Sequence, residues 1–109
     1  MDDRAERIGR NEDIFRKVND QIEGVNEAFG MVTGTMSILC ECGRIDCMEQ
    51  IELTVEEYRA LRSEPTQFAV RPGHEIPDLE DVMARKDGYY LVAKTEREAA
   101  ELAKELADE

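Results

Sequence analysis

The chain has 109 residues, a length typical of one domain with its own hydrophobic core. Acidic residues outnumber basic ones by 26 to 14, which gives a net charge of −12, and no stretch is basic enough to neutralise a phosphate backbone. We therefore expect no nucleic-acid binding, and an acidic surface that suits either solubility or a basic protein partner.

The sequence also predicts a compartment. The N-terminal residues are mostly charged and lack the apolar segment of a signal peptide, and no apolar run is long enough to cross a membrane. The three cysteines are odd in number and closely spaced, unlike the framework of a secreted disulfide-rich domain. We expect a cytoplasmic protein with no membrane contact.

Residues 4–29 are predicted to form one long helix. Apolar side chains recur along it at intervals of three, four and seven residues, a narrow stripe of heptad type. The stripe consists of Ile8, Phe15, Val18, Ile22, Val25 and Phe29, and Asn11 interrupts it. The opposite face carries Arg10, Asp13, Lys17, Asp20 and Glu27. Two uses of the stripe stay open: packing on the domain's own sheet, and pairing with a second chain, including a homodimer through this helix.

The cysteines are predicted to lie at the tip of a β-hairpin. One strand covers Met36 to Glu41, and its return over 48–54 alternates apolar with polar residues. Thr54 and Glu57 then fit a capping box, which predicts a short helix over Val55–Arg62.

Further strands are predicted after this helix. Residues 67–71 form a strand that leads into a Pro-Gly-His turn. Asp87-Gly88 is typical of a two-residue hairpin turn, with strands over 82–86 and 89–95 on either side. Residues 78–86 remain ambiguous, because their first residues also suit a helical turn.

Together these elements predict one α+β domain over residues 1–109. A small antiparallel sheet of about four or five strands, with the short middle helix, occupies residues 36–95. The long N-terminal helix over 4–29 precedes it, and a C-terminal helix over 96–107, rich in alanine and leucine, follows it.

Three cysteines and the only histidine form the sharpest chemical pattern in the chain. Cys40 and Cys42 lie on the same side of a strand, and a turn at Gly43 returns Cys47 across the hairpin. His74 completes a set of three thiolates and one imidazole, which is a full tetrahedral ligand set for zinc and predicts a structural site. An iron–sulfur cluster and free or buried thiols remain alternatives.

Glu75 directly follows the histidine and has four open roles. Its carboxylate can accept a hydrogen bond from the imidazole or from a main-chain amide, or it can lie solvated at the surface. If His74 does not bind the ion, Glu75 becomes a candidate base for metal-assisted hydrolysis. The sequence contains no glycine-rich phosphate loop, and a single histidine in a turn does not indicate a Ser-His-Asp triad.

Four segments of the chain resemble a family of short, acidic, uncharacterised proteins found mainly in actinobacteria. They are Asn11–Asn19, Cys40–Gly43 with Cys47, Leu53–Tyr58 and Phe68–Glu75. The resemblance covers residues 11–75 and implies a cytosolic bacterial protein, without an activity to transfer.

These observations favour a non-enzymatic protein-interaction or regulatory module with a structural zinc site. The N-terminal helix is the predicted contact element, through Phe15, Val18, Ile22 and Val25, and a basic protein is the predicted partner. A redox- or zinc-responsive regulator, whose thiolates release the metal on oxidation, is the first alternative. A metal-dependent hydrolase is the second.

Overall fold

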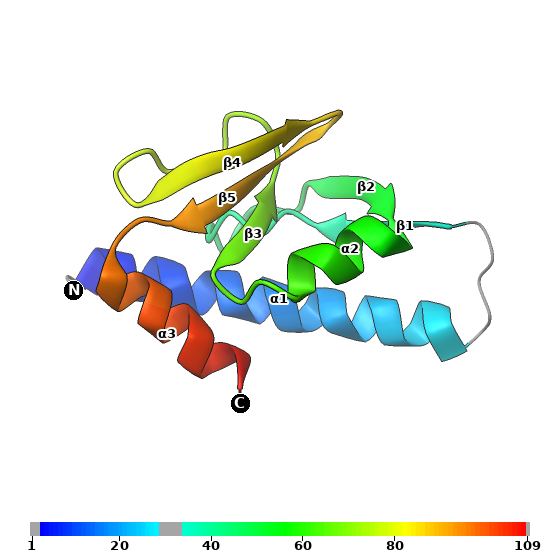
Figure 1. Cartoon of the computed structure of the whole chain (residues 1–109), viewed down its shortest axis with the longest axis horizontal. Coiled ribbons are helices and arrows are strands. Elements are labelled where there is room, and N and C mark those ends of the chain that lie inside the picture. Colours follow the sequence, from blue (N-terminus) through cyan, green and yellow to red (C-terminus); the bar gives the residue numbers. More distant parts are fainter. Residues whose placement is uncertain (1–2, 29–33, 109) are drawn as a thin grey trace.

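A computed structural model describes residues 3–28 and 34–108, and it has the predicted α+β architecture (Figure 1). Along the chain the elements are α1 (Asp3–Ala28), β1 (Thr35–Leu39), β2 (Gln50–Thr54), α2 (Val55–Arg62), β3 (Gln67–Val70), β4 (Glu80–Lys86), β5 (Tyr89–Lys94) and α3 (Arg97–Ala107). Phe29, the last residue of the predicted helix, lies outside the described residues.

The five described strands form two antiparallel sheets, where the sequence suggested one. One sheet pairs β1 with β2, and the other has the order β3-β5-β4. The chain leaves the first sheet through α2, and the next strand, β3, pairs with β5 and not with the first hairpin. The sheets meet just beyond the end of β1, where the Glu41 N–H donates to the carbonyl of Ala69 at 2.8 Å.

Local sequence signals explain several of these elements. Thr54 caps α2: its side chain accepts from the Glu57 N–H at 3.0 Å, and the Glu57 carboxylate accepts from the Thr54 N–H at 2.9 Å. The ambiguous residues 78–86 contain a short turn followed by β4, because the N–H groups of Leu79 and Glu80 both donate to the Ile76 carbonyl.

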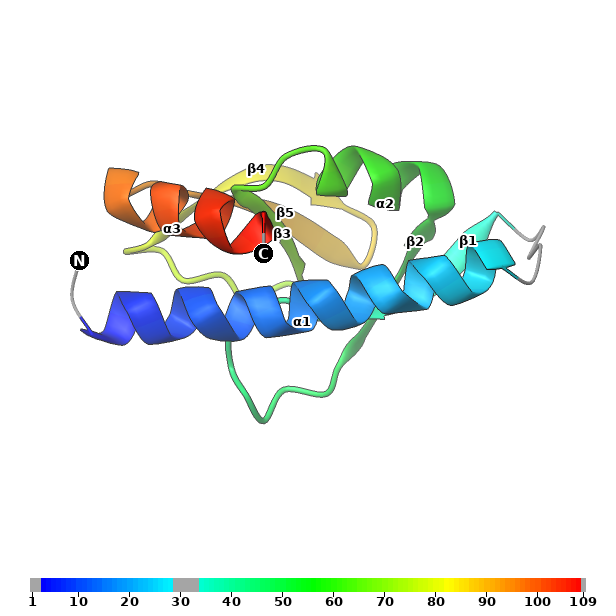
Figure 2. The same ribbon diagram turned by 90° about the horizontal axis from the view of Figure 1, so that it is seen from below.

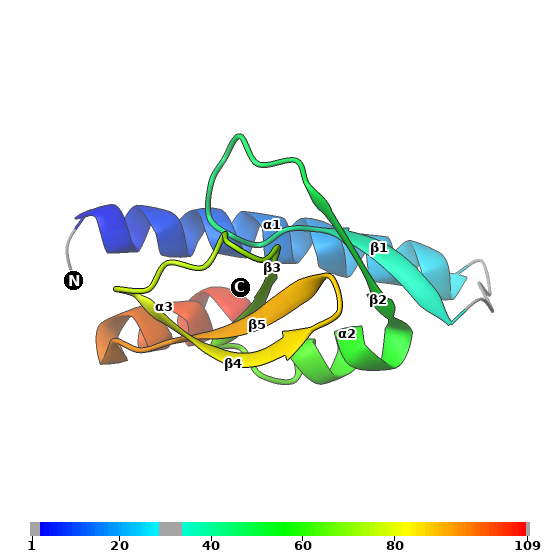
Figure 3. The same cartoon turned by 90° about the horizontal axis from the view of Figure 1, so that it is seen from above.

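Helix α1 runs the length of the molecule beneath both sheets, as seen from two directions in Figures 1 and 2. Helix α3 lies along the N-terminal half of α1, and α2 lies toward its other end (Figure 2). Seen from above, the two sheets lie on the same side of α1 (Figure 3). Within the described ranges, 3–28 and 34–108, no helix combines the length and apolar character needed to cross a membrane.

The inner face of α1 differs from the predicted one. Phe15 is buried and Ile22 packs against the core, as expected, but Val18 and Val25 are 36% and 55% exposed. Much of the buried surface is instead polar, and Asp13, expected on the outer face, is only 6% exposed. The buried polar residues of this helix are Glu12, Asp13, Arg16 and Asn19. Apolar periodicity could not reveal this face, because Arg16 and Asn19 are buried against hydrogen-bond partners from distant elements.

Arg16 shows how such a residue is satisfied. Its guanidinium binds the Asp13 carboxylate at 2.7 Å and donates to the carbonyls of Pro65 at 2.7 Å and Ala103 at 3.0 Å. Lys17 adds a bond to the carbonyl of Leu106 at 2.8 Å. Two cations of α1 therefore meet carbonyls near the C-terminal end of α3, where the helix dipole favours positive charge.

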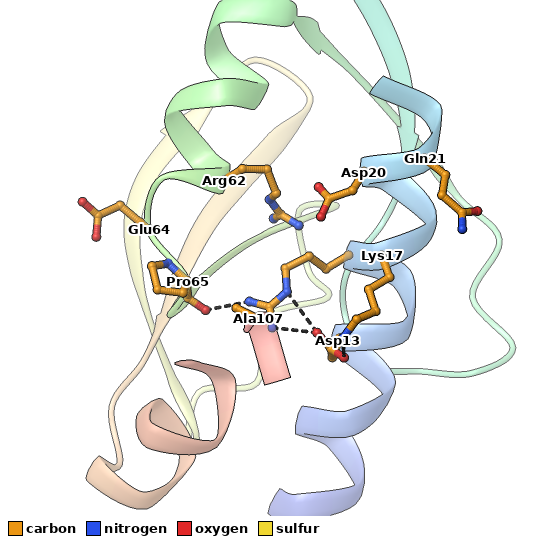
Figure 4. Close-up of a pocket in the computed structure, with 9 residues that line it drawn as sticks. Asp13, Lys17, Asp20, Gln21, Arg62, Glu64, Pro65 and Ala107 are labelled. Carbon is orange, nitrogen blue, oxygen red and sulfur yellow. Dashed lines mark hydrogen bonds and ion pairs between the residues drawn. The ribbon is translucent and has the colours of Figure 1, made fainter. Parts of the chain in front are cut away.

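A cavity of about 350 Å³ lies at this junction, between α1, the α2–β3 connection and the end of α3 (Figure 4). Charged side chains line it, but most of them are paired within the protein. Asp13 pairs with Arg16 and Lys17, and Asp20 accepts a hydrogen bond from the Tyr58 hydroxyl. The cavity therefore does not present a surplus of one charge to a ligand.

A second buried network joins α1 to the three-stranded sheet. The ammonium of Lys94 contacts the carboxylates of Glu12 and Glu80, and all three side chains are at most 2% exposed. Burial, followed by a hydrogen bond with Glu80, raises the pKa of Glu12 well above its usual range. Burial therefore favours the protonated form of Glu12 in the folded protein, and the ammonium of Lys94 lies against the Glu80 carboxylate.

This protonation predicts how stability changes with pH. Because the pKa of Glu12 is higher in the folded state, the stabilisation linked to its proton is complete below the unfolded pKa, near 4.5, and is lost as the pH rises toward the folded value. Glu12→Gln cannot ionise, so its free energy of unfolding relative to wild type should increase between about pH 5 and pH 8. Urea titrations at both pH values measure this difference.

Exposed Glu52, replaced in the same way, is the matched control and should give a difference that does not vary with pH. A Glu12→Gln difference that also stays constant between the two pH values would show that Glu12 is ionised in the folded protein.

Candidate metal centre

The structure brings the four predicted ligand residues together. Cys40 and Cys42 follow β1, Cys47 lies in the loop before β2, and His74 lies in the β3–β4 connection. One ligand atom from each lies within 4.8 Å of all the others. The Sγ atoms of Cys40 and Cys47 are 3.6 and 3.7 Å from His74 Nδ1. A tetrahedral ion with ordinary zinc bond lengths would hold sulfur and nitrogen ligands about 3.6 Å apart, so the cluster is compatible with one metal ion.

Gly43 shapes the turn after the first two cysteines. Its φ is +81°, and a Cβ placed there would lie 2.8 Å from the Ile8 side chain and 3.2 Å from the Ile8 carbonyl. Asn11 of α1 donates to the Gly43 carbonyl at 3.1 Å. The residue that interrupts the apolar stripe therefore holds the turn against the helix.

Glu41 lies between the first two cysteines and is fully buried. One carboxylate oxygen accepts from Arg62 at 2.7 Å and from the Ala69 N–H at 3.1 Å, and the other accepts from Asn19 at 2.8 Å. Asn19 also exchanges two hydrogen bonds with the backbone of Leu39. The segment that presents two sulfurs is thereby fixed to α1, α2 and β3.

The imidazole of His74 is oriented by Glu49. Nε2 lies 2.8 Å from the Glu49 carboxylate, which leaves Nδ1 directed at the sulfurs. Glu75, the predicted candidate, accepts instead from the Gly73 N–H at 2.7 Å, the main-chain role considered for it. Sequence inspection overlooked Glu49, whose only local signal is its position two residues after Cys47.

Backbone N–H groups surround the sulfurs. The Arg71 N–H donates to Cys40 Sγ at 3.2 Å. Each of the other two sulfurs accepts a hydrogen bond from the backbone N–H two residues further along the chain. The Arg44 N–H donates to Cys42, and the Glu49 N–H donates to Cys47. Such donors stabilise thiolates, so the backbone already favours the form that binds a metal.

The three sulfurs differ in how readily they ionise. A hydrogen bond from Cys40, aided by the Arg44 N–H and opposed by burial, lowers the pKa of Cys42 to about 5. The same bond, together with burial, raises the pKa of Cys40, and burial raises the pKa of Cys47. Without a metal ion the cluster therefore favours a single thiolate, that of Cys42. A bound cation is needed to stabilise three thiolates together.

The role of Glu49 can be tested by Glu49→Ala. Loss of the carboxylate frees the imidazole ring, so the affinity for zinc should fall roughly 10- to 100-fold, while the backbone N–H that serves Cys47 is retained. Competition with a chromophoric chelator measures the affinity. Glu75→Ala is the control and should change affinity less; an equal or larger loss in that variant would contradict the assignment.

Neither protein-family models, nor curated proteins, nor solved structures yield a match to this chain.

Proposed function

We propose that this protein is a non-enzymatic interaction or regulatory module whose fold is held together by one zinc ion. The observation that supports the proposal is the convergence of Cys40, Cys42, Cys47 and His74 within 4.8 Å. Four protein ligands complete a tetrahedron and leave no coordination position for water or substrate, which is the arrangement of structural zinc sites.

Zinc fits the donor set better than the alternatives. Three soft thiolates and one imidazole favour zinc over oxygen-seeking ions such as magnesium and calcium. An iron–sulfur cluster with several irons needs its ligands spread around it, whereas these four atoms are spaced for a single ion. Free cysteines also suit the reducing cytoplasm, where we place the protein.

The ion would act as a connection between the two sheets. Cys40 and Cys42 extend from β1, whereas His74 follows β3, so one ion joins segments from both sheets. In a domain of this size the free energy of metal binding adds directly to the free energy of folding.

The other two functions have less structural support. The glutamate of the hydrolase hypothesis, Glu75, is bonded to the Gly73 N–H, and His74 takes the fourth ligand position. For the redox hypothesis, Cys40 and Cys42 are at most 1% exposed and Cys47 is 8% exposed, so an oxidant has access chiefly to Cys47.

We assign the contact surface of the module to the outward face of α1. The residues that form this surface differ in part from those predicted from the sequence. Phe15 is buried and Ile22 packs against the core, so neither is available to a partner. Ile14, Val18 and Val25 are exposed by 49%, 36% and 55%. A continuous helix with exposed apolar residues is a natural site for protein contact.

The zinc assignment predicts one zinc per chain and three protected thiols in protein purified without added metal. Chelation should lower the midpoint of urea denaturation, because the folded state loses a bound ligand. His74→Ala should bind zinc at least ten-fold more weakly, since it removes one of four ligands. Elemental analysis, a thiol assay and chelator competition measure these quantities.

Met48→Ala is the matched control, because this residue directly follows Cys47 in the chain and is 69% exposed. Unchanged zinc affinity in His74→Ala, or purified protein that contains iron and sulfide, would overturn the zinc site. Zinc release by peroxide at doses that oxidise ordinary thiols would favour the redox-responsive regulator.

A further inference from the structure

The outward face of α1 carries a second heptad-type row of residues. Ile14, Val18, Gln21 and Val25 follow one another at spacings of four, three and four residues, which places them on one side of the helix. We call these four residues the outer seam. All four are exposed, in contrast to Phe15 on the inner face of the same helix.

The outer seam has a charge environment that differs from the rest of the chain. Its four members are uncharged, Asn11 precedes them in the same row, and the flanking heptad positions hold Arg10, Phe15, Lys17, Ile22 and Gly24, none of which is acidic. The acidic residues of the middle of α1 have partners elsewhere: Asp13 pairs with Arg16, Asp20 with Tyr58 and Glu23 with Arg59. In a chain with a net charge of −12, this is a face on which two copies can meet without bringing carboxylates together.

We propose that a second copy of this chain covers the outer seam, with the two α1 helices antiparallel about a two-fold axis. The proposal rests on the proposed function, because it assigns an occupant to the same contact surface. Antiparallel coiled helices pair an a position with a d position. Ile14 would therefore face Val25 of the partner subunit, and Val18 would face Gln21 of the partner subunit.

Charge determines the direction of pairing. In a parallel pair, Arg7 continues the same heptad and would lie against its own copy, and Arg4, which pairs with Asp78 at 2.9 Å, would lie one turn further along. In the antiparallel pair these positive ends lie at opposite ends of the interface. Lys17 then lies opposite Gly24 of the partner subunit, a position that carries no charge and whose Cβ site has no atom within 4 Å.

The length of the seam sets the strength of the contact. Ile14 to Val25 spans three helical turns, or about 17 Å. An interface confined to this row is smaller than the roughly 1,200–2,000 Å² typical of stable complexes. The dimer should therefore be reversible, with an apparent mass that rises from monomer toward dimer as the protein concentration increases.

Sedimentation velocity of the zinc-loaded full chain over a wide concentration range tests the association. Val18→Glu places two carboxylates near the centre of the interface and should remain monomeric. Met83→Glu alters an equally apolar residue on β4, 58% exposed and outside the seam, and should associate as wild type does. A wild-type chain that stays monomeric, or Val18→Glu that dimerises normally, would overturn the proposal.

A charge exchange tests the direction of pairing. Ile14→Lys and Val25→Glu should each weaken association at least ten-fold. The double variant should restore it, because the antiparallel arrangement places each lysine opposite a glutamate. Failure to restore association would rule out antiparallel pairing.

Zinc content and circular dichroism are measured on every variant. A monomeric wild type with one zinc per chain would contradict the dimer proposal and still support the zinc-bound module. A wild type that associates but contains no zinc would contradict the zinc assignment and still support the dimer. A monomer that binds an added protein through the seam would show that a different partner occupies it.

Discussion

The arrangement of this protein depends on a buried carboxylate, that of Glu41. It lies between two of the candidate ligands and accepts hydrogen bonds from α1, α2 and β3. An ionised carboxylate without such partners would destabilise the fold by several kcal/mol, so these elements must meet at Glu41 for the chain to fold. The same bonds fix the backbone that carries Cys40 and Cys42, and folding thereby places two of the four ligands.

Helix α1 has two roles that its sequence pattern does not separate. Its inner face supplies buried polar groups, such as Asn19 and Arg16, to the sheets and to α3. Its outer face presents apolar residues, such as Val18 and Val25. The helix is therefore part of the core and also the surface to which we propose that a partner binds. Substitutions on its outer face are for this reason a cleaner test of binding than removal of the helix.

The candidate metal centre is ordered by its surroundings as much as by its four candidate ligands. Backbone N–H groups reach all three sulfurs, and Glu49 fixes the imidazole. The acidic character of the chain does not oppose this arrangement, because the nearest buried carboxylate, Glu41, is neutralised by Arg62 at 2.7 Å. A cation that binds here would meet negative charge from sulfur within a frame that is already ordered.

Much of the local structure was determined by the sequence alone, because it depends on residues close along the chain. The capping box defined α2 from Val55 to Arg62, alternation indicated β2, and Asp87-Gly88 indicated the β4–β5 hairpin. The candidate metal ligands were equally accessible, since thiolates and imidazole are recognisable as a donor set by residue type.

Three features became visible only once distant segments had packed together: the division into two sheets, the inner face of α1, and the contact of His74 with Glu49 in place of Glu75. Each depends on a contact between residues far apart in the chain. The Glu41 N–H donates to the Ala69 carbonyl, the Leu39 N–H donates to the Asn19 side chain, and the Glu49 carboxylate contacts the His74 imidazole. Periodicity reports the apolar face that a segment could bury, but it carries no information about hydrogen-bond partners far away in the chain. Those partners exist only after the elements have packed.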